Sequence, residues 1–251
     1  MGDLILTASS ELLSPGLLPR ETREFASEIK YLIPGELAPR IRQWARGHLA
    51  ADPYGGGAHG DSYEISSLYF DTRAFDVLHR TGSFGRSKYR IRRYGQAPTA
   101  FVERKLKTGN LVSKRRSLIA LPELEKLNTT YAARGWAGYW FHRRIAARAL
   151  APVCRISYMR MARMANSSLG PIRLTLDHDL RAIPISRAAY DECGRQPLAP
   201  NHLILELKYR YAMPELFQQF VEAFQLQAQP VSKYRLAASI PGCVAGLEPS
   251  K

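Results

Sequence analysis

The sequence lacks the segments that would place a protein in a membrane or direct it out of the cell. No apolar run approaches the roughly 18 residues that a membrane-spanning helix needs. The first seven residues carry no basic segment of a secretory signal, and Leu6 stands where a myristoylation signal needs serine or threonine. We therefore expect a cytoplasmic protein that does not insert into a membrane by itself, which leaves room for a separate membrane partner.

Cysteine is scarce, and the commonest phosphate-binding loop is absent. The cysteines, Cys154, Cys193 and Cys243, are odd in number and widely spaced, a pattern typical of neither a disulfide framework nor a zinc site. The glycine-rich segment at residues 52–60 contains no G-x-x-x-x-G-K sequence, so it is not a P-loop. These absences favour a reducing compartment and exclude the usual way of holding a nucleotide.

Acidic residues are few beside the basic ones. The chain has 36 lysines and arginines against 22 aspartates and glutamates, and its formal net charge is +14. Such a charge favours phosphates, nucleic acid or an anionic membrane surface as partners. The length of 251 residues and the hydrophobic content of 45% allow one large β-barrel domain or two small domains. Residues 1–20 and 241–251 lack periodic patterning and are expected to be tails of a domain at 21–240.

A series of short segments has the composition and the boundaries of β-strands. Each is rich in valine, isoleucine, leucine, tyrosine or phenylalanine and is bounded by glycine, proline or polar turns. The predicted strands lie at about residues 25–33, 65–71, 87–94, 99–106, 111–119, 153–161, 172–177 and 202–209. Helical patterns fill the gaps at residues 36–49, in parts of 121–150 and at 214–226.

Basic residues gather on three neighbouring predicted strands. Residues 86–116 contain eleven lysines and arginines and a single acid, Glu103. Because side chains alternate between the two faces of a strand, Lys88, Arg90 and Arg92 share one face, and largely apolar side chains share the other. Burying such a cationic face without partners would cost several kcal/mol per charge. The pattern therefore predicts a polyanionic ligand.

Three further predicted strands alternate in the same way. Glu28 and Lys30 oppose Ile29 and Tyr31, and the segments at 171–177 and 203–209 likewise place charges opposite leucine or isoleucine. One interpretation is a sheet that packs on helices by its apolar face and exposes its charged face to water. The other is a barrel, which roughly eight strands are enough to close, with the charged faces inside. Because so many strands share the pattern, we favour the second interpretation, a tunnel for phosphate.

Nine motifs occur in the order in which they appear in a known family. They are Glu28–Tyr31, Ser67–Thr72, Lys88–Tyr94, Phe101–Leu106, Ser113–Arg116, Arg155–Arg160, Ile172–Asp177, Leu205–Tyr209 and Ser232–Tyr234. In this order they resemble the catalytic domain of the vacuolar transporter chaperone (VTC) polyphosphate polymerases, a family of triphosphate tunnel metalloenzymes. The resemblance covers about residues 24–238.

The resemblance implies an α+β fold in which eight antiparallel strands form a β-barrel tunnel and helices pack outside it. It also implies a polyphosphate polymerase, which transfers the γ-phosphoryl group of a nucleoside triphosphate such as ATP to a growing polyphosphate chain. Mn²⁺ or Mg²⁺ is the implied cofactor.

Nucleic acid is not an expected partner, because the aromatic residues of the basic strands, Tyr89 among them, are expected opposite the cations and offer no adjacent stacking platform.

Site residues follow from the resemblance position by position. The basic residues that match the family's catalytic and phosphate-contacting positions are Lys30, Arg90, Arg92, Lys105, Lys114, Arg160, Arg173 and Lys233. Arg116 and Lys208 share strand faces with Lys114 and Glu206, and they complete the predicted substrate-binding set. Glu206 matches the metal-binding acid, and Glu28 and Glu103 are the further metal candidates.

One departure from the superfamily bears on the activity. Hydrolytic relatives carry E-x-E-x-K on the first strand, where this sequence has Ala26, Glu28 and Lys30. The missing acidic ligand favours the polymerase over a two-metal hydrolase. A metal-dependent triphosphatase or tripolyphosphatase and a noncatalytic polyphosphate-binding module remain the alternatives.

Several charged residues have a structural interpretation beside the functional one. Glu103 and Glu206 each precede a lysine by two positions, so each is alternatively part of an ion pair in a solvated sheet. Asp177 is either an acid behind the site or a turn residue at a strand end.

Other arginines are expected away from the ligand or out of phase with it. Arg93, Arg104 and Arg115 fall on the strand face opposite the proposed lining, which predicts surface charges. Arg155 and Arg160 are out of phase with each other, so only one faces the ligand unless a bulge intervenes.

Overall fold

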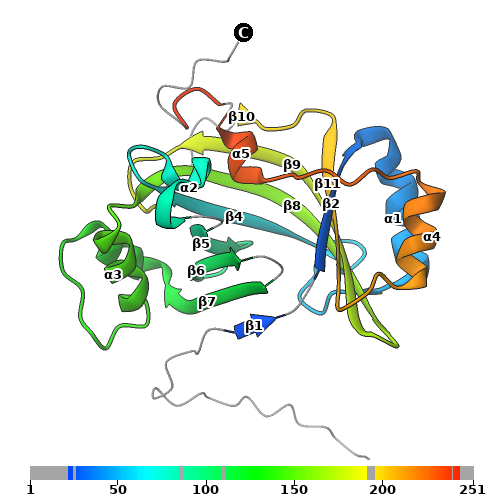
Figure 1. Cartoon of the computed structure of the whole chain (residues 1–251), viewed down its shortest axis with the longest axis horizontal. Helices are drawn as coiled ribbons and strands as arrows, with labels where there is room; N and C mark the ends of the chain where they lie inside the picture. Colours follow the sequence, from blue (N-terminus) through cyan, green and yellow to red (C-terminus); the bar gives the residue numbers. More distant parts are fainter. Residues whose placement is uncertain are drawn as a thin grey trace, which may run out of the picture.

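The computed structural model describes residues 22–24, 27–84, 87–108, 111–190, 196–238 and 240–243. Within them, the strands belong to one antiparallel sheet (Figure 1). The strands are β1 (Thr22–Glu24), β2 (Ser27–Pro34), β3 (Ala50–Ala51), β4 (Ser62–Asp71), β5 (Ser87–Tyr94), β6 (Thr99–Thr108), β7 (Leu111–Ala120), β8 (Ala151–Ser167), β9 (Gly170–Pro184), β10 (Gln196–Pro197) and β11 (His202–Tyr209).

Helices are interspersed among the strands, which makes the fold α+β, as predicted. The α-helices are α1 (Ala38–His48), α2 (Asp76–His79), α3 (Tyr139–Ala147), α4 (Glu215–Ala223) and α5 (Lys233–Ala237). The 3₁₀ helices are η1 (Gly35–Leu37), η2 (Gly82–Phe84) and η3 (Leu121–Asn128). In the described part of the chain, no helix is long and apolar enough to cross a bilayer.

The strand order curls the sheet into a tunnel. It runs β1-β7-β6-β5-β4-β8-β9-β11-β2, and the two-residue strands β3 and β10 pair with β8 and β9. The long strands β2, β4, β5, β6, β7, β8, β9 and β11 are the eight predicted ones. The strands at the two ends of this order, β1 and β2, follow one another in the chain, so the sheet approaches a barrel although the pairings of the described residues do not close it. The predicted fold is confirmed.

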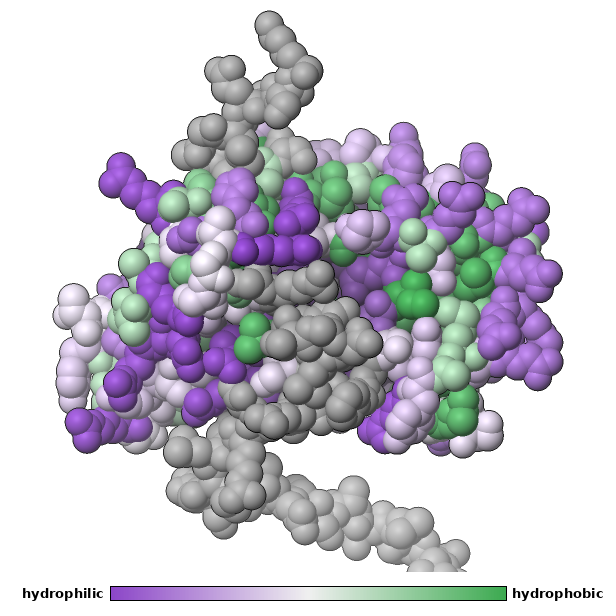
Figure 2. All heavy atoms as spheres, viewed as in Figure 1, coloured by the Kyte–Doolittle hydropathy of each residue, from purple (hydrophilic) through white to green (hydrophobic). Residues whose placement is uncertain are grey.

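Side-chain alternation separates the hydrophobic core from the interior of the tunnel. On β2 and β11, apolar residues such as Tyr31 and Leu205 are buried with α1 and α4. On β5 and β8, Ile91 and Ile156 belong to a second apolar cluster that includes Phe141 of α3. Figure 1 shows α1 and α4 together at one end of the molecule and α3 at the other. Figure 2 shows hydrophilic side chains on the outside at the α1 and α4 end.

Helices α1 and α4 lie close to their predicted ranges. A proline in the first turn starts α1, and Ile41 and Ala45 one turn apart are buried against the sheet. Pro214 precedes α4, whose buried face carries Phe217 and Phe220. The sequence analysis missed α2 and α5, which have only four and five residues. Elements this short show no periodic pattern, and tertiary contacts stabilise them.

The strands β8 and β9 form a hairpin that extends past the predicted strand ends on both sides. A register irregularity in this pair lies between Ser157 and Met159. A β-bulge therefore does intervene between Arg155 and Arg160, one of the two possibilities that the sequence allowed. Arg160 lies beyond the irregularity and borders the tunnel, whereas Arg155 is buried and does not border it.

The segments predicted as tails lie mostly outside the described residues, which begin at residue 22 and end at residue 243. Cys243 belongs to the segment expected to be a C-terminal tail. Its side chain is buried, and its thiol makes a hydrogen bond with the buried thiol of Cys154 on β8. The hydrophobic core therefore reaches residue 243.

A buried carboxylate ties the C-terminal segment to the sheet. Asp71 at the end of β4 accepts hydrogen bonds from the backbone N–H groups of Thr72, Val77 and Leu78. Its Oδ2 also accepts one from the Tyr234 hydroxyl of α5 at 2.6 Å. Burial raises the pKa of Asp71, although the four hydrogen bonds favour the carboxylate. Strand β4 and helices α2 and α5 thus meet at one buried charge.

This contact predicts the stability of a conservative variant. Tyr234→Phe leaves Asp71 with one hydrogen bond fewer at a buried site, so the free energy of unfolding should fall by about 1–3 kcal/mol. Urea unfolding of the wild type and the variant measures the difference. The control is Tyr131→Phe, at a tyrosine that is 79% exposed, which should change it by less than about 0.5 kcal/mol. Equal stability of all three proteins would contradict the proposed anchor.

Candidate anion-binding tunnel

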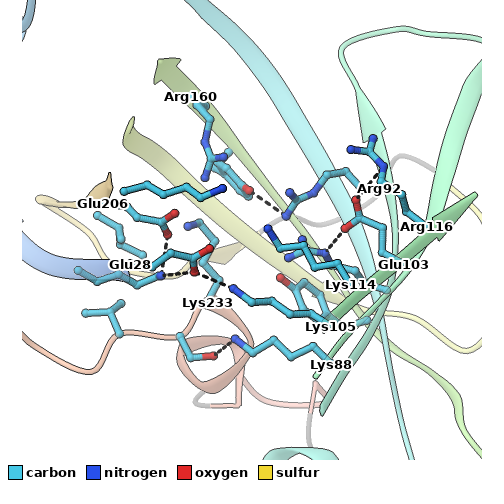
Figure 3. A pocket seen from close by; sticks show the side chains of 18 of the residues that line it. Glu28, Lys88, Arg92, Glu103, Lys105, Lys114, Arg116, Arg160, Glu206 and Lys233 are labelled. Atoms are coloured by element: carbon cyan, nitrogen blue, oxygen red, sulfur yellow. Dashed lines mark hydrogen bonds and ion pairs between the residues drawn. The ribbon is translucent and has the colours of Figure 1, made fainter. Parts of the chain in front are cut away.

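The tunnel holds a cavity of about 250 Å³. Thirteen lysines and arginines line it against three glutamates. Every predicted site residue borders this one cavity: Lys30, Arg90, Arg92, Lys105, Lys114, Arg116, Arg160, Arg173, Lys208, Lys233, Glu28, Glu103 and Glu206. Figure 3 shows the labelled side chains converging from different strands. The structure therefore brings together residues that lie far apart in the sequence.

One wall of the cavity is formed by β2 and β11, whose acids make a chain of alternating charges that ends on Lys105 of β6. The antiparallel register places Glu206 opposite Lys30, and their side chains meet at 2.6 Å. Glu28 lies 3.7 Å from Lys30 and 2.6 Å from Lys105. Burial by itself would raise the pKa of Glu206, but the charges of Lys30 and Arg160 outweigh it and hold that pKa well below the ordinary value. Both acids on this wall are carboxylates at neutral pH.

The opposite wall is arranged around Glu103 on β6. The Arg90 guanidinium on β5 donates to its carboxylate at 2.7 Å, and Arg116 on β7 lies at 3.9 Å. Burial favours the neutral acid, yet the nearby Arg90 and Arg92 lower the pKa of Glu103 to about 2. Arg92 is buried and donates weakly to the Tyr158 hydroxyl at 3.4 Å. Its charge has no carboxylate partner among the hydrogen bonds of the described residues.

Asp177 on β9 holds two of the predicted phosphate-contacting residues. Its side chain is buried, and it accepts a bidentate pair of hydrogen bonds from Arg160 at 2.6 and 2.8 Å. Lys233 of α5 donates to the same carboxylate at 2.5 Å. Burial raises the pKa of Asp177, but the two cations lower it more, so it stays ionised. Of the two interpretations left open for Asp177, the structure supports the acid behind the site.

Arg173 is held in part by the glycine-rich segment at residues 52–60. It donates to the buried Asp52 at 2.5 Å and to the Tyr63 hydroxyl at 2.8 Å. The glycine-rich segment thus supplies a buried acid that orients a cation at the tunnel wall.

Of the three arginines expected on the outer face of the sheet, only Arg93 lies away from the cavity. Arg93 donates to a backbone carbonyl and lies near the ring of Tyr190, away from the cavity. Arg104 and Arg115 border the cavity, which the alternation did not predict. The guanidinium of Arg115 nevertheless lies 4.5 Å from the ring centre of Trp140 on α3, in the outer layer.

Two groups of lining residues are missing from the predicted set of site residues, although the alternation had already placed Lys88 on the cationic face of its strand. Lys88 shares the face of Arg90 and borders the cavity, but it was not in the predicted set. Tyrosines also line the cavity, at Tyr63, Tyr69, Tyr94 and Tyr158. The expectation that aromatic residues of the basic strands lie opposite the cations is therefore wrong for Tyr94, which has the same alternation phase as Arg92. It holds for Tyr89, which is buried in the core.

Two carboxylates fit a divalent cation that is also bound by substrate. Glu28 and Glu206 converge on the Lys30 ammonium from neighbouring strands. Mg²⁺ commonly takes one or two carboxylates together with phosphate oxygens and water. No cluster of three or more histidine, cysteine, aspartate or glutamate side chains suited to a metal occurs within the described ranges. Glu103 is engaged by Arg90 on the other wall, so Glu206 and Glu28 are the better candidates.

Comparison with known proteins identifies the fold and the family. The curled antiparallel sheet with its basic interior is a triphosphate tunnel fold. The VTC domain family model matches residues 25–240, and the chain belongs to this family. Searched against curated proteins, the sequence has no match.

The similar solved structures have low sequence identity to this chain. A Bacillus halodurans protein described as a candidate adenylate cyclase is 16% identical, with a TM-score of 0.50 over 84% of this chain and 95% of its own. A Hippeastrum protein is described as a candidate adenylyl cyclase with a dominant triphosphatase activity. It is also 16% identical, with a TM-score of 0.44 over 85% of this chain and 97% of its own. The first likeness supports the architecture alone.

Two adjacent arginines on β5 test the inner face of the tunnel. Arg92→Met removes a buried charge from the cavity, whereas Arg93→Met removes one from the outer face, and both change the net charge equally. Because a charged hydrogen bond contributes about 1.5–3 kcal/mol, Arg92→Met should weaken tripolyphosphate binding about 10- to 100-fold. Arg93→Met should leave the tripolyphosphate affinity within about twofold of the wild-type value. Calorimetry measures both, and equal losses would mean that the two strand faces do not differ in binding.

Proposed function

We propose that this protein is a polyphosphate polymerase that extends a polyphosphate chain with the γ-phosphoryl group of a nucleoside triphosphate, ATP being the expected donor. The observation that supports this most is the enclosed excess of positive charge, thirteen lysines and arginines around one cavity. A cavity of this kind binds an extended polyanion better than a compact neutral substrate. Membership of the VTC domain family agrees with it.

The cations divide into two roles in this proposal. Arginines present planar pairs of donors that match phosphate oxygens, and Arg90, Arg92, Arg160 and Arg173 approach the cavity from the three strands β5, β8 and β9. Lysines such as Lys114 supply compact charges that follow a chain as it moves. Together they would hold the triphosphate and the acceptor chain in line.

The chemical step needs no covalent nucleophile on the protein. A terminal oxygen of the acceptor chain attacks the γ-phosphorus, the new P–O bond forms, and the bond to the bridging β–γ oxygen breaks to release the nucleoside diphosphate. Catalysis in such transfers comes from positioning and from charges that stabilise the transferred phosphoryl group. Mn²⁺ or Mg²⁺ held by Glu206 and Glu28 would supply further stabilisation of that charge.

A metal-dependent triphosphatase is the second candidate. The same cations would hold a triphosphate while water replaces the acceptor chain, and Glu28 and Glu206 offer a carboxylate pair on one wall. A noncatalytic polyphosphate-binding module would need only the cations. The proposed partners are a nucleoside triphosphate and polyphosphate, in the cytoplasm, with any membrane partner supplied separately.

One incubation separates these functions. Purified protein is incubated with ATP and Mn²⁺ or Mg²⁺, and the products are separated on a polyphosphate gel. A ladder of chains is the result expected of the polymerase, and Arg92→Met should remove it. Release of orthophosphate without a ladder would establish the triphosphatase instead, and neither product would favour the binding module.

A variant of Glu206 separates chemistry from binding. If Glu206 holds the metal, Glu206→Ala should lower metal-dependent turnover at least about 100-fold, because the metal stabilises charge that develops in the transition state. Polyphosphate affinity in the absence of metal should stay equal or rise, since an acid leaves a cationic tunnel. Turnover and calorimetric binding are measured on the same preparations.

The matched control for this variant is Glu222→Ala, at an exposed acid on α4. Glu222→Ala should change neither the metal-dependent turnover nor the polyphosphate affinity. Wild-type turnover in Glu206→Ala would refute the metal role. Loss of binding and of the folded state together would instead assign Glu206 to a structural ion pair with Lys30.

A further inference from the structure

Lys88 differs from the other cations of the tunnel in its contacts. Its ammonium donates to the Ser232 hydroxyl at 3.2 Å. In the part of the chain that the structure describes, no carboxylate lies within ion-pair distance of it. By contrast, Lys30 and Lys105 contact glutamates, and Lys233 contacts Asp177. Lys88 therefore occupies a wall of the tunnel with only a neutral hydroxyl as its partner.

The position of Lys88 is also distinctive, because two cavities meet there. Lys88 and Ser232 border the tunnel cavity, and both also border a smaller cavity of about 50 Å³. This second cavity has room for a small group, since one water needs about 10–15 Å³ of such volume. Its other lining residues come from the region of α2 and from β5 and α5: Val77, Leu78, Arg80, Ser87, Tyr234 and Arg235.

The charged and titratable groups around Lys88 are almost all cationic. From β2, β5, β6 and α5 they are Lys30, Arg90, Lys105 and Lys233, and each lowers the affinity of Lys88 for a proton. Arg80, Arg235 and Tyr234 face it from the second cavity, and Tyr69 borders the tunnel on β4. Burial, followed by the charges of Arg90 and Lys105, lowers the pKa of Lys88 to about 7. Without a ligand, Lys88 is therefore partly neutral near pH 7.

We propose that Lys88 and Ser232 form a further phosphoryl-binding subsite, at the junction of the two cavities, and that its occupation by polyphosphate is coupled to the uptake of one proton by Lys88. This inference rests on the proposed binding of polyphosphate in the tunnel. A phosphoryl group at this junction supplies the negative charge that the surroundings of Lys88 lack. The ammonium and the Ser232 hydroxyl both donate to phosphate oxygens, and their mutual hydrogen bond gives way to the ligand.

The direction of the pH dependence follows from this coupling. Bound polyphosphate raises the pKa of Lys88 above its value in the empty tunnel, because opposite charges favour the protonated form. Binding therefore takes up a proton at a pH above about 7 and takes up none well below it. At pH 8 the uptake should approach about 0.9 proton per site, and the affinity should fall as the pH rises from 7 to 9. Tunnel arginines stay charged throughout this range.

The experiment measures proton uptake by calorimetry. Long-chain polyphosphate is titrated into metal-free protein at pH 8 in two buffers that differ in their enthalpy of ionisation. Long chains are used because only their end groups carry weakly acidic protons, so the internal phosphoryl groups contribute no uptake. The wild type should take up about 0.5–0.9 proton for each site filled.

Three variants assign the proton to Lys88. Lys88→Met should lose the uptake and weaken binding about tenfold at pH 7, where the wild-type lysine can be charged. Lys88→Arg should keep the affinity and lose the uptake, because arginine stays protonated at every pH tested. Lys208→Met, the matched control, removes a lysine on β11 that borders only the tunnel cavity. It should weaken binding while leaving the uptake unchanged.

The possible outcomes separate this inference from the proposed function. Uptake that persists in Lys88→Met or Lys88→Arg, or wild-type binding without uptake, would overturn the subsite while leaving the polymerase proposal intact. Proton-coupled binding in a protein that makes no polyphosphate from ATP would overturn the polymerase and keep the subsite. A protein that binds no polyphosphate at all would overturn both. Lys88→Arg keeps the charge of the site, so the test does not depend on the folding of Lys88→Met.

Discussion

Repulsion between like charges is the constraint that this fold must satisfy. Lysines and arginines from most strands of the sheet share one cavity, where they would repel one another strongly in the absence of counter-charges. A few acids, placed by strand register, relieve this repulsion. Glu206 makes an ion pair with Lys30, and Glu103 makes one with Arg90 on the opposite wall. Asp177 makes an ion pair with Arg160. The cations outnumber these acids, and the remaining charge is what a polyphosphate chain would neutralise.

The ion pairs also fix the shape of the tunnel before any ligand arrives. Most of them join residues on different strands, so each pair resists a change in register or spacing. The C-terminal segment contributes in the same way, because Lys233 completes the wall through Asp177 while Tyr234 anchors α5 on Asp71. A preorganised set of cations loses little conformational entropy on binding, which favours a site built for repeated transfer along a chain.

Paired and unpaired cations therefore have different consequences for binding. A lysine held by a glutamate stays charged over a wide pH range and serves mainly to position the ligand. Among the described residues, Lys88 has only a hydroxyl as its hydrogen-bond partner, and burial beside other cations lowers its pKa to about 7, from which we infer that it couples binding to the proton concentration. The difference arises from neighbours contributed by other strands and by α5, not from the lysine itself.

The sequence by itself determined the strands and the inward faces of residues such as Lys30 and Arg90, and its resemblance to a known family implied that the strands are antiparallel. Alternation is a local property with a period of two, so it can be read without knowing the fold. Only the tertiary structure decided that Asp177 holds Arg160 and that, among the described residues, no carboxylate lies within ion-pair distance of Lys88. These facts depend on a bulge in β8, on cross-strand register and on the approach of α5, which come from distant parts of the chain. Local spacing cannot encode which side chains from separate strands will meet, because that depends on how the whole sheet curls.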